Sequence, residues 1–281
     1  MTDDDIQIIL DKLRSEDKES SHKAFETIRE SGDVRFVEGL VFMFGDADPA
    51  LQKECITLIG YIGDVEAVAM LLDLLEHPKY SGLLSEIVMA LGRIGDNEAV
   101  PALLQLLNTE IDRVVREDVI TALGLIGDES AEKPLLALVA DDNVYVRQKI
   151  AKALGSFNSG DCVKALTGML KDTDRSVRGN AVRSLGEIGD SSVISELDEM
   201  LDDAEWYVRG QAVGALAGFD DKAIIKPLCY ALEDPNYKIR VVAAEKLAEM
   251  GGEEALEALR QAQKVYNNPA IDNALKKLTG E

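Results

Sequence analysis

The chain has 281 residues, of which 46% are hydrophobic and 5% are aromatic, and its apolar residues are mostly Leu, Ala, Val and Ile. This composition excludes a largely disordered chain and favours helix-on-helix packing over an aromatic-rich β-sandwich. The net charge of −22 repels nucleic-acid phosphates and anionic membranes, so we expect neither as a partner. The same acidity either serves solubility or attracts the basic segment of a protein partner.

The first ten residues, MTDDDIQIIL, lack the positively charged start of a secretory signal. No apolar run reaches the length that crosses a bilayer. The three cysteines, Cys55, Cys162 and Cys229, are far apart in sequence and odd in number, so no disulfide framework is expected. These features favour a cytoplasmic protein.

In chain order, residues 3–15 predict a lone helix that caps the fold, and residues 268–279 predict a second cap at the far end. Between them, over residues 17–265, one phrase returns about eight times at steps of 31 or 32 residues. Its marker position is occupied by Ile28, Ile59, Leu91, Leu123, Leu154, Leu185, Leu216 and Leu247. With two helices in each repeat and two caps, the sequence predicts about eighteen helices.

The repeat at residues 177–201 shows how one unit is built. An apolar stripe at helical spacing defines its first helix, which Gly189 ends and after which Asp190 caps the second. The stripes are Val177, Ala181, Leu185 and Ile188 in the first helix, and Val193, Ile194, Leu197, Met200 and Leu201 in the second. A single pair cannot bury both stripes, so the pairs are expected to stack into an all-α solenoid that forms one domain over residues 1–281.

The residues now carry a family resemblance. The pattern Asp174, Val177, Arg178, Ala181, Leu185, Gly186, Ile188, Gly189 and Asp190 resembles HEAT repeats, and is most similar to the short HEAT-like repeats of phycobilin (PBS) lyases. The resemblance implies a right-handed superhelix of antiparallel helix pairs. Residues 79–90 depart from the pattern, with Leu84 where the repeat has arginine. The motif is specific for a fold that serves many functions.

A row of arginines recurs once per repeat. Each follows an acidic or amide residue by four positions: Asp112, Asn143, Asp174, Glu205 or Asn236. In HEAT-like arrays such arginines make polar contacts between repeats, often at the turns, so a structural role is expected rather than an anion-binding track. The row is Arg116, Arg147, Arg178, Arg209 and Arg240.

Residues that support catalysis are scarce. The only histidines, His22 and His77, stand 55 residues apart, and the chain lacks the repeated His-Glu pairs of the HEAT-like iron enzyme deoxyhypusine hydroxylase. Cys55 and Cys162 occupy repeat positions held elsewhere by Ala or Val and are expected in the core. We therefore expect no catalytic, cofactor or metal site.

Aromatic side chains are the best indication of a partner surface. Trp206 and Tyr237, each three residues before a row arginine, are predicted to be exposed neighbours on one edge, although they could also pack flat over adjacent repeats. The resemblance places the second helices on the concave face. There, a repeat row otherwise small or polar contains Phe42 and Tyr230. Glu199 belongs to the same row, and acids nearby suit a Lys- or Arg-bearing partner.

Three functions follow, of which the first is preferred. The preferred function is a non-enzymatic scaffold that binds another protein, with oligomeric state undetermined. The second, implied by the resemblance, is a lyase-like factor that handles a bilin. The third, DNA repair by a HEAT-like glycosylase, requires a basic concave face and is disfavoured by the net charge of −22.

Overall fold

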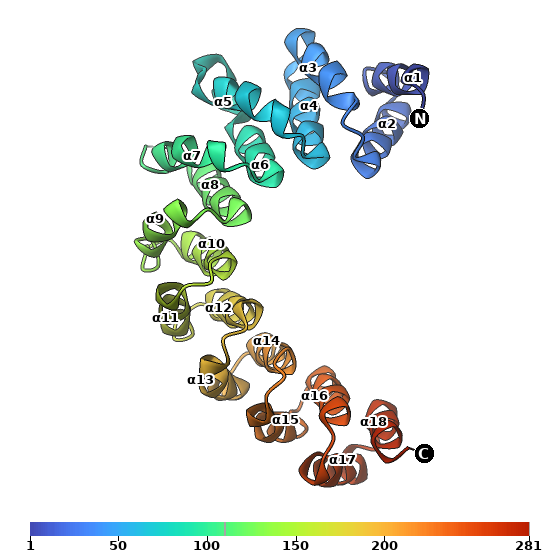
Figure 1. Ribbon diagram of the computed structural model, residues 1–281, viewed down its shortest axis with the longest axis vertical. Coiled ribbons are helices and arrows are strands. Elements are labelled where there is room, and N and C mark those ends of the chain that lie inside the picture. The colour runs from blue at the N-terminus through green and yellow to red at the C-terminus, as the bar shows by residue number, and fades with distance from the viewer. Residues whose placement is uncertain (110, 281) are drawn as a thin grey trace. The chain divides into compact units, whose positions relative to one another are not determined.

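The computed structural model describes residues 1–109 and 111–280 (Figure 1). This part of the chain is 80% helical, with eighteen α-helices and no strand. The prediction of an all-α solenoid of paired helices is confirmed.

The helices fall into two compact units, Met1–Ala137 and Leu138–Glu281. The first unit contains α1 (Asp3–Leu13), α2 (Lys18–Ser31), α3 (Phe36–Asp46), α4 (Pro49–Ile62), α5 (Val68–Glu76), α6 (Leu84–Ile94), α7 (Val100–Leu107), α8 (Arg113–Ile126) and α9 (Glu132–Leu136). The second contains α10 (Val144–Ala153), α11 (Gly160–Met169), α12 (Arg175–Ile188), α13 (Ile194–Glu199), α14 (Trp206–Ala217), α15 (Ile225–Ala231), α16 (Tyr237–Met250), α17 (Glu253–Tyr266) and α18 (Pro269–Thr279). That residues 1–281 form one domain stays a prediction.

Short 3-10 turns join many of these helices. They are η1 (Val65–Ala67), η2 (Pro78–Leu83), η3 (Asn97–Ala99), η4 (Glu129–Ala131), η5 (Leu154–Ser156), η6 (Ser191–Val193), η7 (Met200–Asp202) and η8 (Lys222–Ile224). The departure predicted at residues 79–90 coincides with η2, after which α6 starts late, at Leu84.

The Gly-Asp pair of the repeat ends one helix and caps the next element, as the sequence predicts, with one refinement. Gly189 ends α12 with φ 73°, a left-handed conformation that glycine adopts without steric cost. The carboxylate of Asp190 then accepts from the backbone amide of Ser192 and caps η6, a 3-10 turn that leads into α13. The aspartate therefore starts the second helix through an intervening turn.

All eight marker residues of the repeat are fully buried. They are Ile28, Ile59, Leu91, Leu123, Leu154, Leu185, Leu216 and Leu247, each at 0% exposure. Full burial of one such side chain contributes about 1.5–3 kcal/mol. The repeated phrase thus supplies one core residue to every helix pair.

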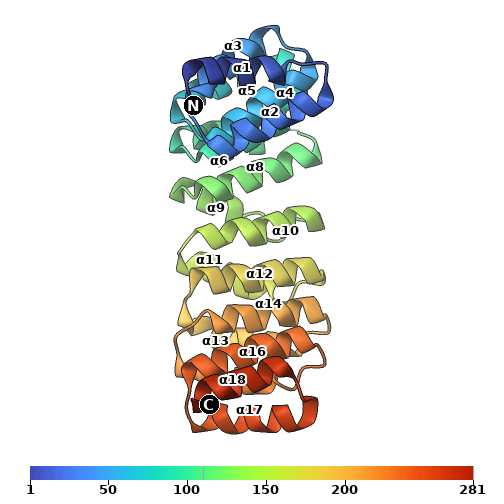
Figure 2. The same ribbon diagram turned by 90° about the vertical axis from the view of Figure 1, so that its right-hand side faces the viewer.

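Each unit consists of two layers. The first helices of the pairs form one layer, α2, α4, α6 and α8 in the first unit and α10, α12, α14 and α16 in the second (Figure 2). The second helices form the other layer. The cap α1 packs beside α3 in the second-helix layer, and the cap α18 packs beside α16 in the first-helix layer.

The first-helix layer is the more closely packed of the two. At Gly92 of α6, an added Cβ would lie 2.6 Å from the Cα of Ala122 in α8, so only glycine permits this approach. Gly60 and Gly186 meet Ala90 and Ala215 in the same way. Small residues at the contacts therefore draw the first helices together.

This packing corrects one expectation. The second helices were expected to line the concave face, but the first helices lie on the inner side of the bend within each unit (Figure 1). The layer with the shorter helix spacing must lie on the inside of a bend. Phe42 and Tyr230, which belong to second helices, are consequently on the outer side of their respective units.

Candidate protein-binding surfaces

Arginines of the predicted row form a ladder in the second unit. Nε of Arg178 donates to the Oδ2 of Asp203 at 2.7 Å, and its Nη1 donates to the carbonyl of Asp172 at 2.9 Å. Arg147 binds Asp172, and Arg209 binds Asp234, in the same geometry at 2.7 Å. Each of Asp172, Asp203 and Asp234 therefore receives one arginine on its carboxylate and the next on its carbonyl.

The row has two further members, Arg240 and Arg116. Arg240, the last of the row, donates to the carbonyl of Asp234 and places its guanidinium 4.0 Å from the ring centroid of Tyr266. At the position where the earlier repeats carry the paired aspartate, this repeat has Val265. Arg116 is the row member in the first unit, on α8.

The acidic and amide residues four positions before the arginines have another task. Asp112, Asn143, Asp174 and Asn236 each cap the helix that follows by accepting from its free backbone amides. Glu205 makes no cap but accepts from Arg175 at 3.3 Å. The ladder aspartates lie six residues before the next arginine of the row, so their 31-residue period was visible in the sequence.

The ladder also lowers the pKa of two of its aspartates. The hydrogen bond from Arg147 lowers the pKa of Asp172 below its ordinary value, against the opposing effect of burial. Burial raises the pKa of Asp203, but the hydrogen bonds from Arg178 and the amide of Glu205, with both arginine charges, outweigh it and leave the pKa lowered. These carboxylates are thus held ionised as structural partners.

The predicted aromatic edge lies on two adjacent helices. Trp206 is the first residue of α14 and Tyr237 is the first residue of α16, and each is 56% exposed. The helices α14 and α16 pack against each other. Two large side chains therefore stand at the same end of neighbouring first helices, with more than half of each open to solvent.

The outer candidates are exposed as well. Phe42 on α3 is 74% exposed, and Tyr230 on α15 is 53% exposed. The hydroxyl of Tyr230 donates to Asp202, and this hydrogen bond raises the pKa of the phenol. Because Phe42 and Tyr230 belong to different units, each is a separate candidate surface.

Asp202, the partner of Tyr230, belongs to a group of acidic residues. Glu199, the acid predicted at this surface, is exposed at the end of α13. Burial, followed by the charges of Asp202 and Glu199, raises the pKa of Asp198. The segment Ile194–Asp202 contains four carboxylates and no basic residue.

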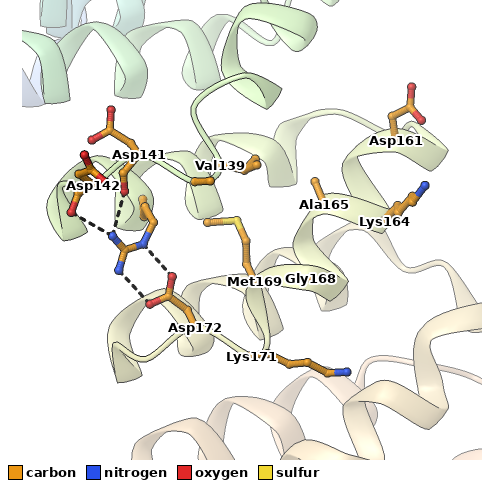
Figure 3. Close-up of a pocket in the computed structure, with 12 residues that line it drawn as sticks. Val139, Asp141, Asp142, Asp161, Lys164, Ala165, Gly168, Met169, Lys171 and Asp172 are labelled. Carbon is orange, nitrogen blue, oxygen red and sulfur yellow. Dashed lines mark hydrogen bonds and ion pairs between the residues drawn. The ribbon is translucent and has the colours of Figure 1, made fainter.

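Grooves run between successive second helices. One in the second unit, about 690 Å³, is lined by Val139, Ala165, Gly168 and Met169, with Lys164 on α11 and Lys171 just after it (Figure 3). A groove of about 560 Å³ between α15 and α17 includes Tyr230. Gln105, Gly168 and Gln261 occupy the same repeat position as Tyr230, and all four residues line grooves of this kind.

The residues with possible redox or metal chemistry are dispersed. Cys55 and Cys162 are buried, as predicted, and burial raises the pKa of the Cys55 thiol to about 12. Burial and then Glu254 raise the pKa of Cys229 to about 11. Among residues 1–109 and 111–280 no group of three His, Cys, Asp or Glu side chains is arranged to hold a metal.

Over the same residues no helix is long and apolar enough to cross a membrane.

The fold and these surfaces define an α-solenoid repeat protein with exposed aromatic and charged faces. A family model of HEAT repeats matches residues 37–124, 131–206 and 197–271, and the chain belongs to the HEAT-repeat family. A comparison with functionally curated proteins returned no match.

Solved structures share the fold. YibA of Escherichia coli is 19% identical, with a TM-score of 0.59 over 95% of this chain and 99% of that one. An engineered protein is 22% identical, with a TM-score of 0.53 over 98% and 88% of the two chains. A chain from the complex of CpcE and CpcF of phycocyanin lyase from Nostoc sp. PCC7120 is 19% identical, with a TM-score of 0.51 over 82% and 94%. At these identities the similarity concerns the fold.

Proposed function

We propose that the chain is a non-enzymatic scaffold that binds a protein partner along a helical surface of its repeats. The observation that carries the proposal is the exposed pair Trp206 and Tyr237 on adjacent, packed helices. Exposed Trp and Tyr are the side chains most enriched among residues that dominate binding energy at interfaces. The solved complex of CpcE and CpcF shows that a similar fold takes part in a protein complex.

Both rings of the pair keep more than half of their area in contact with solvent. Trp206 and Tyr237 each leave 56% of their area in water, which is unfavourable for large apolar rings without a partner. A partner that covers both rings would recover this burial. Free cysteines without disulfides agree with a cytoplasmic scaffold.

The proposal is tested by affinity capture from lysate of the native organism, read by mass spectrometry. The wild type is compared with Trp206→Ala/Tyr237→Ala and with Phe42→Ala/Tyr230→Ala as a matched pair of exposed aromatics. A partner retained by the wild type and the control but lost by Trp206→Ala/Tyr237→Ala supports the edge as the site. Loss only with Phe42→Ala/Tyr230→Ala moves the site to an outer surface, and no partner in any arm contradicts the scaffold.

A second candidate is a lyase-like factor that handles a bilin. It is favoured by the groove of about 690 Å³ beside α11, a size typical of small-molecule sites, which carries the carboxylates Asp142 and Asp161. The neighbour from the phycocyanin lyase complex adds to this candidate. Titration of the protein with a bilin, read by visible absorbance, tests it: an unchanged bilin spectrum removes the candidate.

A further inference from the structure

The two layers of the second unit differ in charge. Although the chain carries −22 overall, α10 and α14 in the first-helix layer contain no acidic residue. The second-helix segment Ile194–Asp202, in contrast, carries four acids and no base. The negative charge of this unit is therefore unevenly distributed, and the first-helix layer deviates from the rest of the chain.

Residues at helical spacing define the solvent-facing side of this layer. On α10 these residues include Lys149 and Lys152, and on α12 they include Asn180 and Arg183. On α14 the equivalent positions are Gln211 and the exposed Gly214. Figure 2 shows α10, α12 and α14 side by side in this layer. We call the solvent-facing side of these three helices the inner strip.

The cations of the inner strip are available to a partner. Lys152 and Arg183 are exposed and Lys149 is half-buried. Within the described residues, no carboxylate pairs with any of the three. Arg183 donates instead to the amide oxygen of Gln211 at 3.2 Å. This differs from Arg147, Arg178 and Arg209, whose charges are neutralised in the ladder.

The acidic outer layer does not cancel this local charge. One helix diameter, about 10 Å, separates the two layers, and the Debye length at physiological ionic strength is about 8 Å. The acids on α13 therefore lie beyond the contact distance of a ligand that is bound on the inner strip. A ligand within contact distance of Lys149, Lys152 and Arg183 meets a positive surface.

The extent of the strip indicates the kind of ligand. Glu187 ends it on α12, and the exposed Glu245 and Glu249 on α16 close it on the far side. Three packed helices span about 20 Å between the outer axes, the length of a helix of about thirteen residues. A long polyphosphate would extend past this strip over acidic surface, whereas a short acidic segment fits within it.

The floor of the strip allows close contact. A Cβ added at Gly214 would meet nothing within 4 Å, so α14 presents bare backbone and small side chains there. Apolar residues of a bound segment can approach α14 while its carboxylates reach Lys149, Lys152 and Arg183. The exposed Trp206 stands at the N-terminal end of the same helix.

From this charge complementarity we propose that the inner strip of α10, α12 and α14 binds an acidic segment of a protein partner. The proposal rests on the proposed scaffold function and specifies the chemistry of its partner. It reverses the expectation of a basic partner that the overall charge suggested.

The test is fluorescence anisotropy on the full chain with three labelled probes: an amphipathic Glu/Leu peptide of about four helical turns, the same peptide with Lys for Glu, and single-stranded DNA of similar length. The variants are Lys149→Glu/Lys152→Glu/Arg183→Glu and a matched control of exposed lysines on the second-helix layer, Lys222→Glu/Lys226→Glu/Lys264→Glu. Both change the net charge equally.

We expect the Glu/Leu peptide to bind the wild type and the control, with an affinity that falls as salt is added. Its affinity for the strip variant should be at least about tenfold lower. The proposal is overturned if the Lys/Leu peptide binds as well, if both variants lose affinity equally, or if no Glu/Leu binding is measurable. Tighter binding of DNA would replace the protein segment by a nucleic acid. Failure here leaves the scaffold standing if the Trp206→Ala/Tyr237→Ala variant still loses its captured partner.

Discussion

Glycines in the helices of this protein serve two different purposes. Gly92 is buried where α6 meets α8, and any side chain there would collide with Ala122. Gly214 is exposed on α14, and a methyl group there would meet nothing within 4 Å. The two glycines occupy different repeat positions, Gly92 directly after the marker Leu91 and Gly214 two residues before the marker Leu216, but the sequence does not show which position meets a neighbouring helix.

Because of this difference, we predict opposite changes in stability when each glycine is replaced by alanine. We expect Gly92→Ala to destabilise the chain by about 1–3 kcal/mol, because the helices must move apart. We expect Gly214→Ala to stabilise it by about 0.4–1 kcal/mol, because alanine reduces the conformational entropy of the unfolded chain at no steric cost. Urea unfolding followed by circular dichroism measures both, and equal effects would refute the packing account.

At the scale of the element, the arginine ladder joins the turns of successive helix pairs. Arg178 is 15% exposed and Asp203 is 6% exposed, so removal of one partner leaves a largely desolvated charge. We expect Arg178→Ala to destabilise the chain by about 3 kcal/mol. Arg175→Ala is the control, since its contact with Glu205 is exposed and contributes less than about 1 kcal/mol. Urea unfolding of both variants distinguishes the two contacts.

The ladder also predicts a pH dependence. The pKa of Asp172 is lowered in the folded chain from a reference of 3.8, so the unfolded chain binds the proton more readily. The stabilisation from this carboxylate is therefore complete above pH 3.8 and is lost as the pH falls through the folded pKa. We expect Asp172→Asn to be less stable than the wild type at pH 7 and to lose less stability on acidification. Unfolding curves at several pH values test this, and parallel pH profiles would contradict it.

The sequence predicted the elements well because their signals are local. The stripe at Val177, Ala181 and Leu185, with Gly189 at its end, is sufficient to place one helix and its cap. The partner of Arg178 was harder to predict, because Asp203 lies 25 residues away and pairing depends on how helices pack. The inner layer was assigned wrongly for the same reason. The close approach of Gly92 to Ala122 sets helix spacing, and no single-repeat pattern records it.

For the candidate surfaces, the sequence predicted exposure, but it placed Phe42 and Tyr230 on the wrong side of the solenoid (Figure 1). Trp206 and Tyr237 stand at a repeat position where two earlier repeats have Arg113 and Arg175, and both are exposed in the structure. The inner strip had a sequence signal, the absence of Asp and Glu from residues 144–153 and 206–217, but a net charge of −22 concealed it. Charge becomes informative at this scale only after the helices are assigned to layers.

At the scale of the whole molecule, the prediction of one domain over residues 1–281 is tested against the two compact units. In a repeat protein, stability is the sum of repeat terms and interfaces between neighbours, so unfolding spreads along the chain when the interfaces are strong. Hydrogen exchange at increasing urea concentrations measures the unfolding of both units in one experiment. Peptides of Met1–Ala137 report on the first unit, and peptides of the remaining residues report on the second.

The Gly92→Ala change, which lies only in the first unit, separates the alternatives. If the chain is one domain, the variant should lower the urea midpoint of peptides from both units by the same amount, because they unfold together. If the units unfold independently, peptides from residues 138–280 should keep the wild-type midpoint while those from residues 1–137 shift. We expect a common shift, because every marker residue from Ile28 to Leu247 is fully buried and the repeat pattern continues without a break in its period.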